Sequence, residues 1–142
     1  ELFFSKLVIL FEGETEEQAL PITIERYFDS VIGVDTVKND LIGGIFDLEP
    51  RMKKYSPGNE FIKHTDSRTI ASETRKYAYI LYLNDDFDNG ETTFYDGNGP
   101  ISSIKPQTGS LLLFPVHSTY VHAGEEVNNG TKYIYNGFVN IF

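Results

Sequence analysis

The sequence predicts a mainly-β domain of the sandwich or jelly-roll type, and three observations support this fold class. From about Arg51 onward, short segments with strand-like composition alternate with turn-forming runs of Gly, Pro, Asn and Asp. No segment with helical periodicity interrupts them, which argues against a parallel α/β sheet. The length of 142 residues suits one domain with its own core rather than two. We therefore expect residues 45–142 to form one β domain.

The first 44 residues have a different character. The segment KLVILFE predicts a buried strand. After it, Thr15 and Gln18 have the spacing of a capping box, and the acidic residues between them suit the positive end of a helix dipole. The helix would extend to about Phe28, with a kink or a delayed start at Pro21. We interpret residues 1–44 as a strand and helix packed on the β domain, or as a fusion remnant.

The strands expected after residue 44 are bounded by clear turn signals. The turn signals are SPGN, DDFDNG, DGNGP, KPQTG and NNG. The strands are RMKKYS, EFIKHTD, KYAYILYLN, TTFYD, ISSIKP, SLLLFP, TYVHAGEEV and KYIYNGFVNIF. Eight short strands with this punctuation are typical of two packed antiparallel sheets.

Composition excludes some functions and favours others. A net charge of −9 with a pI near 4.7 argues against a protein that grips nucleic acid through clustered Lys and Arg. The absence of cysteine removes disulfides and thiolate chemistry. No apolar run approaches the roughly 20 residues that span a bilayer, and nothing resembles a signal peptide. We therefore expect a cytoplasmic protein without a membrane or nucleic-acid partner. The oligomeric state cannot be read from these features.

A histidine and an aspartate lie one residue apart in the segment FIKHTD. In a strand, His64 and Asp66 would point to the same face. His122 ends another apolar strand, and the chain holds one further histidine, His117. Two histidines and one carboxylate form the facial triad that suits non-haem Fe(II), whereas zinc prefers more nitrogen or sulfur ligands. The pair by itself is also compatible with an ion pair on a surface strand.

Four segments in this order resemble the Fe(II)/2-oxoglutarate dioxygenases of the prolyl-4-hydroxylase type: KKYSPGNEFIKHTD, YILYLNDDFDNGETTFY, IKPQTGSLLLFP and VHAGEEVNNGTKYI. The resemblance covers about residues 45–142 and implies a double-stranded β-helix, which is a jelly roll of two facing sheets. It implies His64, Asp66 and His122 as catalytic iron ligands. It also implies that Lys132 and Tyr82 bind the distal carboxylate of 2-oxoglutarate. The cofactors implied are Fe(II), 2-oxoglutarate and O2, with ascorbate as an auxiliary reductant.

The spacing between His122 and Lys132 gives a geometric prediction. If NNG closed a tight hairpin, the two residues would lie roughly 17 Å apart along the ladder, too far for one 2-oxoglutarate molecule to bridge. If the turn is instead an arch between facing sheets, the separation is ~10 Å. The metal interpretation therefore predicts an arch. His117 lacks the following glycine and the downstream lysine, so we interpret it as a loop or rim residue.

The N-terminal segment resembles a second family. KLVILFEGETEEQALPITIERYF is similar to the opening strand and helix of the Toprim domain in nucleases of the overcoming-lysogenization-defect type. In that family the position of Glu12 joins a later Asp-x-Asp pair to bind Mg2+. The Asp86–Asp88 pair lies inside the oxygenase pattern instead, so the acid cluster for two-metal chemistry is incomplete. A fusion remnant, a chimera and a coincidental pattern all remain open.

The resemblance implies a hydroxylase that acts on an unactivated C–H bond and releases succinate and CO2. It favours a prolyl residue of a peptide or protein as substrate. Asn89-Gly90 replaces the usual Gly-Gly, and the last strand lacks the basic or tryptophan positions often found there. A free amino acid, another protein side chain or a nucleobase therefore remain open as substrates. Two other functions stay open: a non-catalytic jelly-roll binding module and a fragment of a Mg2+-dependent nuclease.

Overall fold

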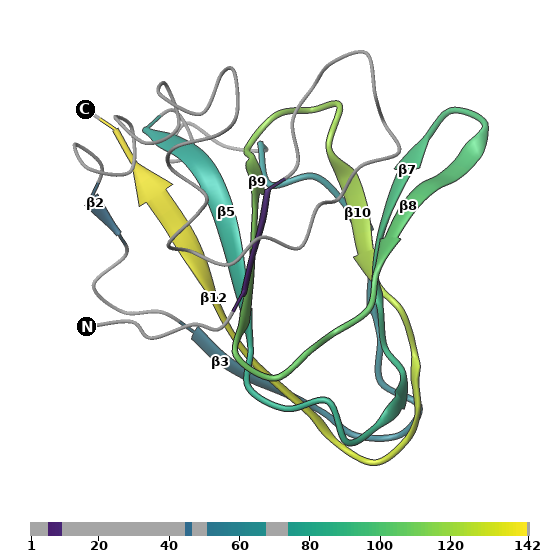
Figure 1. Cartoon of the computed structure of the whole chain (residues 1–142). Helices are drawn as coiled ribbons and strands as arrows, with labels where there is room; N and C mark the ends of the chain where they lie inside the picture. The colour runs from purple at the N-terminus through teal and green to yellow at the C-terminus, as the bar shows by residue number, and fades with distance from the viewer. Residues whose placement is uncertain (1–5, 10–44, 47–50, 68–73, 142) are drawn as a thin grey trace.

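The computed structural model describes residues 6–9, 45–46, 51–67 and 74–141, and only the backbone of 6–9 and 45–46. Within these ranges the regular elements are strands, arranged in two facing sheets with a small two-stranded ribbon (Figure 1). The helix predicted for residues 15–28 lies outside the described residues. The strands are β1 (Lys6–Ile9), β2 (Ile45–Phe46), β3 (Arg51–Tyr55), β4 (Phe61–His64), β5 (Arg75–Tyr82), β6 (Asp88–Asn89), β7 (Thr92–Asp96), β8 (Gly99–Ile104), β9 (Ser110–Pro115), β10 (Val121–Gly124), β11 (Val127–Asn129) and β12 (Lys132–Asn140).

The larger sheet has the order β1-β9-β5-β12-β2, with β3 also paired to β12. Strand β12 is long and alternates buried and partly exposed positions, as expected for a strand with one face on the core. Its antiparallel register with β3 places Lys132 opposite Tyr55, and Asn136 opposite Arg51. Because alternate residues of a strand point to the same side, Lys132 and Asn136 lie on the face of the sheet that also carries core residues.

The smaller sheet has the order β4-β10-β7-β8 and is antiparallel. His122 of β10 is the cross-strand partner of His64 on one side and of Phe94 on the other. In Figure 1, β10, β7 and β8 stand across from β5, β9 and β12. This arrangement is the jelly roll that the sequence predicted, and it places the two histidines on neighbouring strands.

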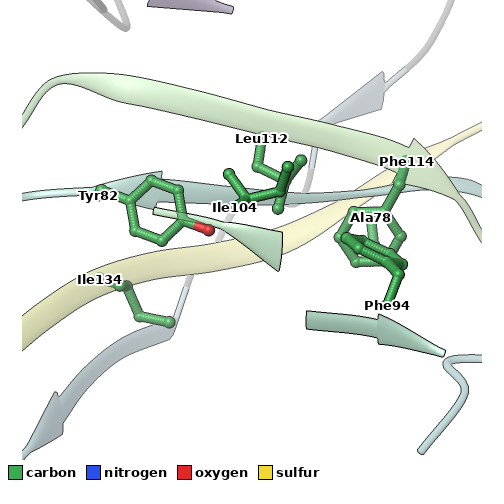
Figure 2. Packing of buried hydrophobic residues seen from close by; sticks show 7 residues of the cluster. All are labelled: Ala78, Tyr82, Phe94, Ile104, Leu112, Phe114 and Ile134. Atoms are coloured by element: carbon green, nitrogen blue, oxygen red, sulfur yellow. The ribbon is translucent and has the colours of Figure 1, made fainter. Parts of the chain in front are cut away.

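The core fills the space between the two sheets (Figure 2). Phe94 of the smaller sheet meets Phe114 of the larger sheet edge to face, with ring centroids 5.1 Å apart. The buried cluster consists of Ala78, Tyr82, Phe94, Ile104, Leu112, Phe114 and Ile134. Because both sheets contribute to it, their relative position is fixed by packing as well as by the chain connections.

Most predicted strands are confirmed, with differences in their bounds. The strand predicted as EFIKHTD ends at His64, so Asp66 lies beyond it. The segment DDFDNG, predicted as a turn, contains the short strand β6, which pairs with β11. The N-terminal strand β1 joins β9 in parallel, although the rest of that sheet is antiparallel. In the described part of the chain, no helix has the length and apolar character needed to cross a bilayer.

Candidate metal centre and cosubstrate pocket

Two adjacent strands and a bend bring His64, Asp66 and His122 together. His64 is the last residue of β4, and His122 lies directly opposite it on β10. Asp66 lies in the bend after β4. The prediction that Asp66 shares a strand face with His64 was therefore wrong about the local structure. The bend changes the direction of the chain after His64, and this brings the Asp66 carboxylate close to both histidines.

The three side chains converge closely enough to share one ion. Their potential ligand atoms all lie within 4.8 Å of one another. The Asp66 carboxylate is 3.5 Å from Nε2 of His64 and 3.7 Å from Nε2 of His122. The two imidazole rings have centroids 4.2 Å apart. Among the described residues, this is the group whose donor set fits a facial triad.

Backbone hydrogen bonds fix the tautomer of both histidines. Nδ1 of His64 lies 2.8 Å from the carbonyl oxygen of Ile62, and Nδ1 of His122 lies 3.0 Å from that of Tyr120. A carbonyl oxygen only accepts, so each Nδ1 carries the hydrogen and donates it. In the neutral rings, both Nε2 lone pairs are then available to a metal, which is the usual arrangement around metal-binding histidines.

The electrostatics of the three groups also suit a cation. Burial lowers the pKa of His122, outweighing the opposite effects of its hydrogen bond to Tyr120 and of Asp66, and this favours the neutral ring. Burial raises the pKa of Asp66, but the polar contact with His64 and the electrostatic effects of His122 and Lys53 outweigh it, so the pKa lies below its usual value. The centre thus combines two ring nitrogens with one carboxylate, and its residues fit Fe(II).

A cavity of about 390 Å3 adjoins the three side chains. It is lined by residues of both sheets, including Lys132 and Thr92 as well as all three metal-site residues. Lys132 is 3% exposed, and its Nζ donates to the carbonyl oxygen of Gly90 at 2.6 Å. Burial lowers the pKa of Lys132 to about 8, against the opposing effect of Glu91 and Glu125. The cavity therefore has a buried cation positioned to meet an anionic ligand.

Tyr82 lies beside Lys132 but belongs to the core cluster. Its ring centroid is 5.8 Å from Nζ of Lys132, and its hydroxyl shares a 2.7 Å hydrogen bond with the Thr92 hydroxyl. Thr92, rather than Tyr82, is among the cavity's lining residues. Burial raises the pKa of Tyr82, so its hydroxyl stays protonated. Its predicted contact with the cosubstrate stays a prediction.

Sequence reasoning missed two residues at this end of the cavity. Tyr55 faces Lys132 across the β3–β12 pair, with its ring centroid 5.4 Å from Nζ, and it lines the cavity together with Thr92. Tyr55 lies near the end of the predicted strand RMKKYS, just before the SPGN turn, and that position was the available signal. His117, by contrast, is exposed in the loop between β9 and β10 and hydrogen-bonds Thr119, in agreement with its interpretation as a loop residue.

The arch predicted between His122 and Lys132 is confirmed. His122 belongs to β10 in the smaller sheet, and Lys132 begins β12 in the larger sheet. Strand β11 connects them and pairs with β6 rather than with either neighbour in sequence. Gly130 has φ +79°, and a Cβ there would lie 2.7 Å from the backbone oxygen of Asp86, so this bend requires glycine.

Comparison with known proteins agrees with this geometry. The sequence profile described as the 2OG-Fe(II) oxygenase superfamily matches residues 50–140. The chain belongs to that superfamily. Membership implies Fe(II), 2-oxoglutarate and O2 as the reaction's cofactors, and the His–Asp–His group described above provides the corresponding metal donors. A second profile, the Toprim domain of overcoming-lysogenization-defect-like proteins, matches residues 3–39, most of which lie outside the described ranges.

Two proteins similar in sequence to this chain are hydroxylases. Prolyl 3-hydroxylase 2 of Mus musculus is 37% identical over 60 residues, which make up 41% of this chain and 8% of that protein. A PKHD-type hydroxylase of Crocosphaera subtropica is 27% identical over 95 residues, covering 63% of this chain and 41% of that protein. The chain thus spans less than half the length of these relatives.

A solved structure supports the fold. The viral collagen prolyl hydroxylase of Paramecium bursaria chlorella virus 1, in its 2OG complex, superposes with a TM-score of 0.59 at 21% identity. The superposition covers 77% of this chain and 71% of that one. At this level of identity the likeness concerns the fold, which is the jelly roll expected from the sequence.

Proposed function

We propose that this chain is the oxygenase domain of an Fe(II)- and 2-oxoglutarate-dependent hydroxylase that acts on a prolyl residue of a peptide or protein, with succinate and CO2 as coproducts. The observation that carries the proposal is the convergence of two Nε2 atoms and one carboxylate beside a cavity with a buried ammonium group. Family membership supports the reaction class, and the hydroxylase relatives support the substrate class.

In this proposal His64, Asp66 and His122 hold the metal. Three protein donors on an octahedral ion leave open positions for a chelating cosubstrate and for O2. When bound, Fe(II) and 2-oxoglutarate would activate O2, which is the oxidant for C–H hydroxylation. Backbone hydrogen bonds keep the two imidazole rings oriented. If the ring of His64 or His122 rotated, it would lose its hydrogen bond to the carbonyl oxygen of Ile62 or Tyr120, respectively.

Lys132 binds the distal carboxylate of 2-oxoglutarate in this proposal. Its ammonium group has three donors, of which the Gly90 carbonyl takes one. The remaining donors are available to an anion in a buried setting, where a charge-assisted hydrogen bond is stronger than at the surface. The hydroxyl of Thr92, already paired with Tyr82, lies in the same cavity wall.

The cavity also has room and suitable walls for a substrate ring. Apolar lining residues come from β5, β9 and β12, and its volume of about 390 Å3 is within the range of small-molecule sites. The apolar lining residues of these strands are Ala78, Ile80, Phe114, Ile134 and Phe138, and Phe61 of β4 joins them. A prolyl ring is apolar and compact, and the relatives named as prolyl hydroxylases make it the first substrate to test.

The two alternative functions have less support. If the chain were a non-catalytic jelly-roll module, there would be no reason for His122 to be 5% exposed with its free nitrogen directed at a carboxylate. A nuclease fragment would need acids near the metal donors, yet Asp86 and Asp88 are exposed and do not line the cavity. The position of Glu12 lies outside the described residues.

Anaerobic addition of Fe(II) and then 2-oxoglutarate tests the proposal directly. We expect a weak visible charge-transfer band and thermal stabilisation, followed by succinate formation when O2 and a proline-containing peptide are admitted. His64→Ala and Asp66→Ala should lose the band while keeping the fold, as judged by circular dichroism. A wild-type protein that shows neither the band nor stabilisation would favour the binding module. Full turnover in either variant would refute the ligand assignment.

A further inference from the structure

The cavity beside the metal site carries a charge opposite to that of the whole protein. The chain has a net charge of −9, yet among the described lining residues four side chains are Arg or Lys and the one carboxylate is Asp66. Lys132 has a proposed role at one end. Three cations remain that neither the metal site nor the cosubstrate uses: Arg51, Lys53 and Arg75.

Strand register separates these cations from Lys132. Arg51, Lys53 and Tyr55 share one face of β3 because alternate residues of a strand point the same way. Tyr55 lies opposite Lys132, and Arg51 lies opposite Asn136 four residues farther along β12. At ~3.3 Å per residue the two ends are roughly 13 Å apart. The cavity therefore has one cationic end at Lys132 and a second at Arg51.

Among the described residues, no salt bridge pairs a carboxylate with the cations of the second end, and Asp66 of the metal site acts on Lys53 only through its charge. The salt bridges of the described residues both belong to Asp66 and the two histidines, so none reaches Arg51, Lys53 or Arg75. Aromatic faces hold two of the cations: Nζ of Lys53 is 4.3 Å from the Phe61 ring centroid, and Cζ of Arg75 is 3.9 Å from that of Phe138. These contacts orient the charges without neutralising them.

A further feature of this end favours an anionic ligand. Lys53 is half-buried, and burial together with Arg51 lowers its pKa, so its charged form is destabilised in the free protein. A bound anion would offset that cost.

We propose that Arg51, Lys53 and Arg75 bind a carboxylate of the substrate and so select anionic substrates. This inference rests on the proposed function, because it assigns the substrate that the hydroxylase orients. The carboxylate comes either from an acidic residue that flanks the target proline in a peptide or from a free amino acid. Lys132 and the cations of β3 would then hold the two organic anions at opposite ends of one cavity.

The first experiment uses the full 142-residue chain with matched ligands. Three peptides contain one proline and differ only in the flanking residues, which are Glu, Gln or Lys. L-proline and prolinamide form the second pair, since the amide removes the carboxylate. Fluorescence anisotropy with labelled peptides measures binding, and succinate release measures turnover. We expect binding of the Glu peptide to exceed that of the Gln peptide by roughly tenfold at low salt, with the Lys peptide weakest, or proline to exceed prolinamide.

Variants of β3 test whether Arg51 and Lys53 cause the preference for anionic ligands. In the Arg51→Gln/Lys53→Gln protein the preference should vanish, whereas Lys54→Gln should retain it, because Lys54 is exposed and lies outside the cavity. In Arg51→Glu/Lys53→Glu, where two carboxylates face the one remaining cation, the Lys peptide should bind better than the Glu peptide. A reversal of this kind distinguishes charge recognition from a loss of folding.

The outcomes separate this inference from the function on which it rests. If wild-type protein forms the Fe(II)–2-oxoglutarate complex but shows no preference in either ligand pair, the inference fails and the proposed function stands. If the β3 variants instead raise KM for 2-oxoglutarate with an unchanged ligand preference, the cations serve the cosubstrate, which also overturns the inference. Absence of the complex in wild-type protein contradicts the proposed function itself.

Discussion

Replacement of Lys132 by methionine should improve folding stability and impair 2-oxoglutarate binding in the same variant. Lys132 is 3% exposed, and burial lowers its pKa from 10.5 to about 8. At about 1.4 kcal/mol for each pKa unit, the buried ammonium form costs about 3 kcal/mol at neutral pH. Methionine has a similar length and carries no charge, so it removes this cost.

The expected gain is smaller than that figure because one hydrogen bond is lost. The Gly90 carbonyl, which accepts from Nζ at 2.6 Å, would have no donor in the variant, at a cost of about 1 kcal/mol. Lys132→Met should therefore raise the free energy of unfolding by about 2 kcal/mol at pH 7. Urea titration of the protein without metal or cosubstrate measures this difference.

The same substitution should weaken 2-oxoglutarate binding by roughly 100-fold. A buried carboxylate that loses its charged partner typically costs about 2–5 kcal/mol. Anaerobic titration of the Fe(II) protein with 2-oxoglutarate gives the dissociation constant, and Lys132→Arg, which keeps the charge, should recover part of the affinity. Lys54→Met serves as the control, since Lys54 is exposed and lies outside the cavity.

The reasoning fails if Lys132→Met is less stable than wild type at pH 7 and binds 2-oxoglutarate normally. That pair of results would make Lys132 a structural residue whose hydrogen bond to Gly90 outweighs its burial cost. A variant that is less stable but also loses 2-oxoglutarate would contradict the stability argument alone. Because the two quantities are predicted to change in opposite directions, general damage to the fold cannot imitate the expected outcome.

Three further predictions follow from the same structure. Between pH 8 and 10.5 the unfolding free energy of wild type should rise relative to that of Lys132→Met by up to about 3 kcal/mol, because the unfolded lysine keeps its proton to pH 10.5 whereas folded Lys132 releases it near pH 8; urea titrations of both proteins across this range measure the difference. Asp66→Asn should abolish the increase in melting temperature that Fe(II) gives the wild type, measured anaerobically, since the variant has no anionic ligand. Gly137→Ala should destabilise the protein by about 1–3 kcal/mol in urea titration, because its Cβ would lie 2.6 Å from the Tyr79 hydroxyl, whereas Gly97→Ala, with open space around it, should not.

Much of the fold and of the candidate site could be predicted from local patterns. The alternation and turn signals located β7 and β9 at their observed bounds. The family resemblance pointed to His64, Asp66, His122 and Lys132, and the structure places all four around one cavity. Distance reasoning on the NNG turn then predicted that His122 and Lys132 belong to facing sheets, and the topology confirms it. Side-chain periodicity and turn signals were sufficient for the strands because they depend on neighbours in sequence.

Other features required contacts between distant segments. Whether Asp66 continues the strand depends on where pairing between β4 and β10 ends, and the bend after His64 could not be read from FIKHTD. The core position of Tyr82 depends on Thr92, ten residues away on the opposite sheet. The second cationic end of the cavity likewise arises only when β3 pairs with β12 and faces the metal site.

The sequence by itself determined which chemical groups are available and which segments extend into strands, because both follow from residue type and short-range sterics. The tertiary structure decided which of those groups share a cavity, which hydroxyl is committed to the core and which charges lack a partner. These properties depend on the packing of two sheets across one core, where residues far apart in the chain become neighbours.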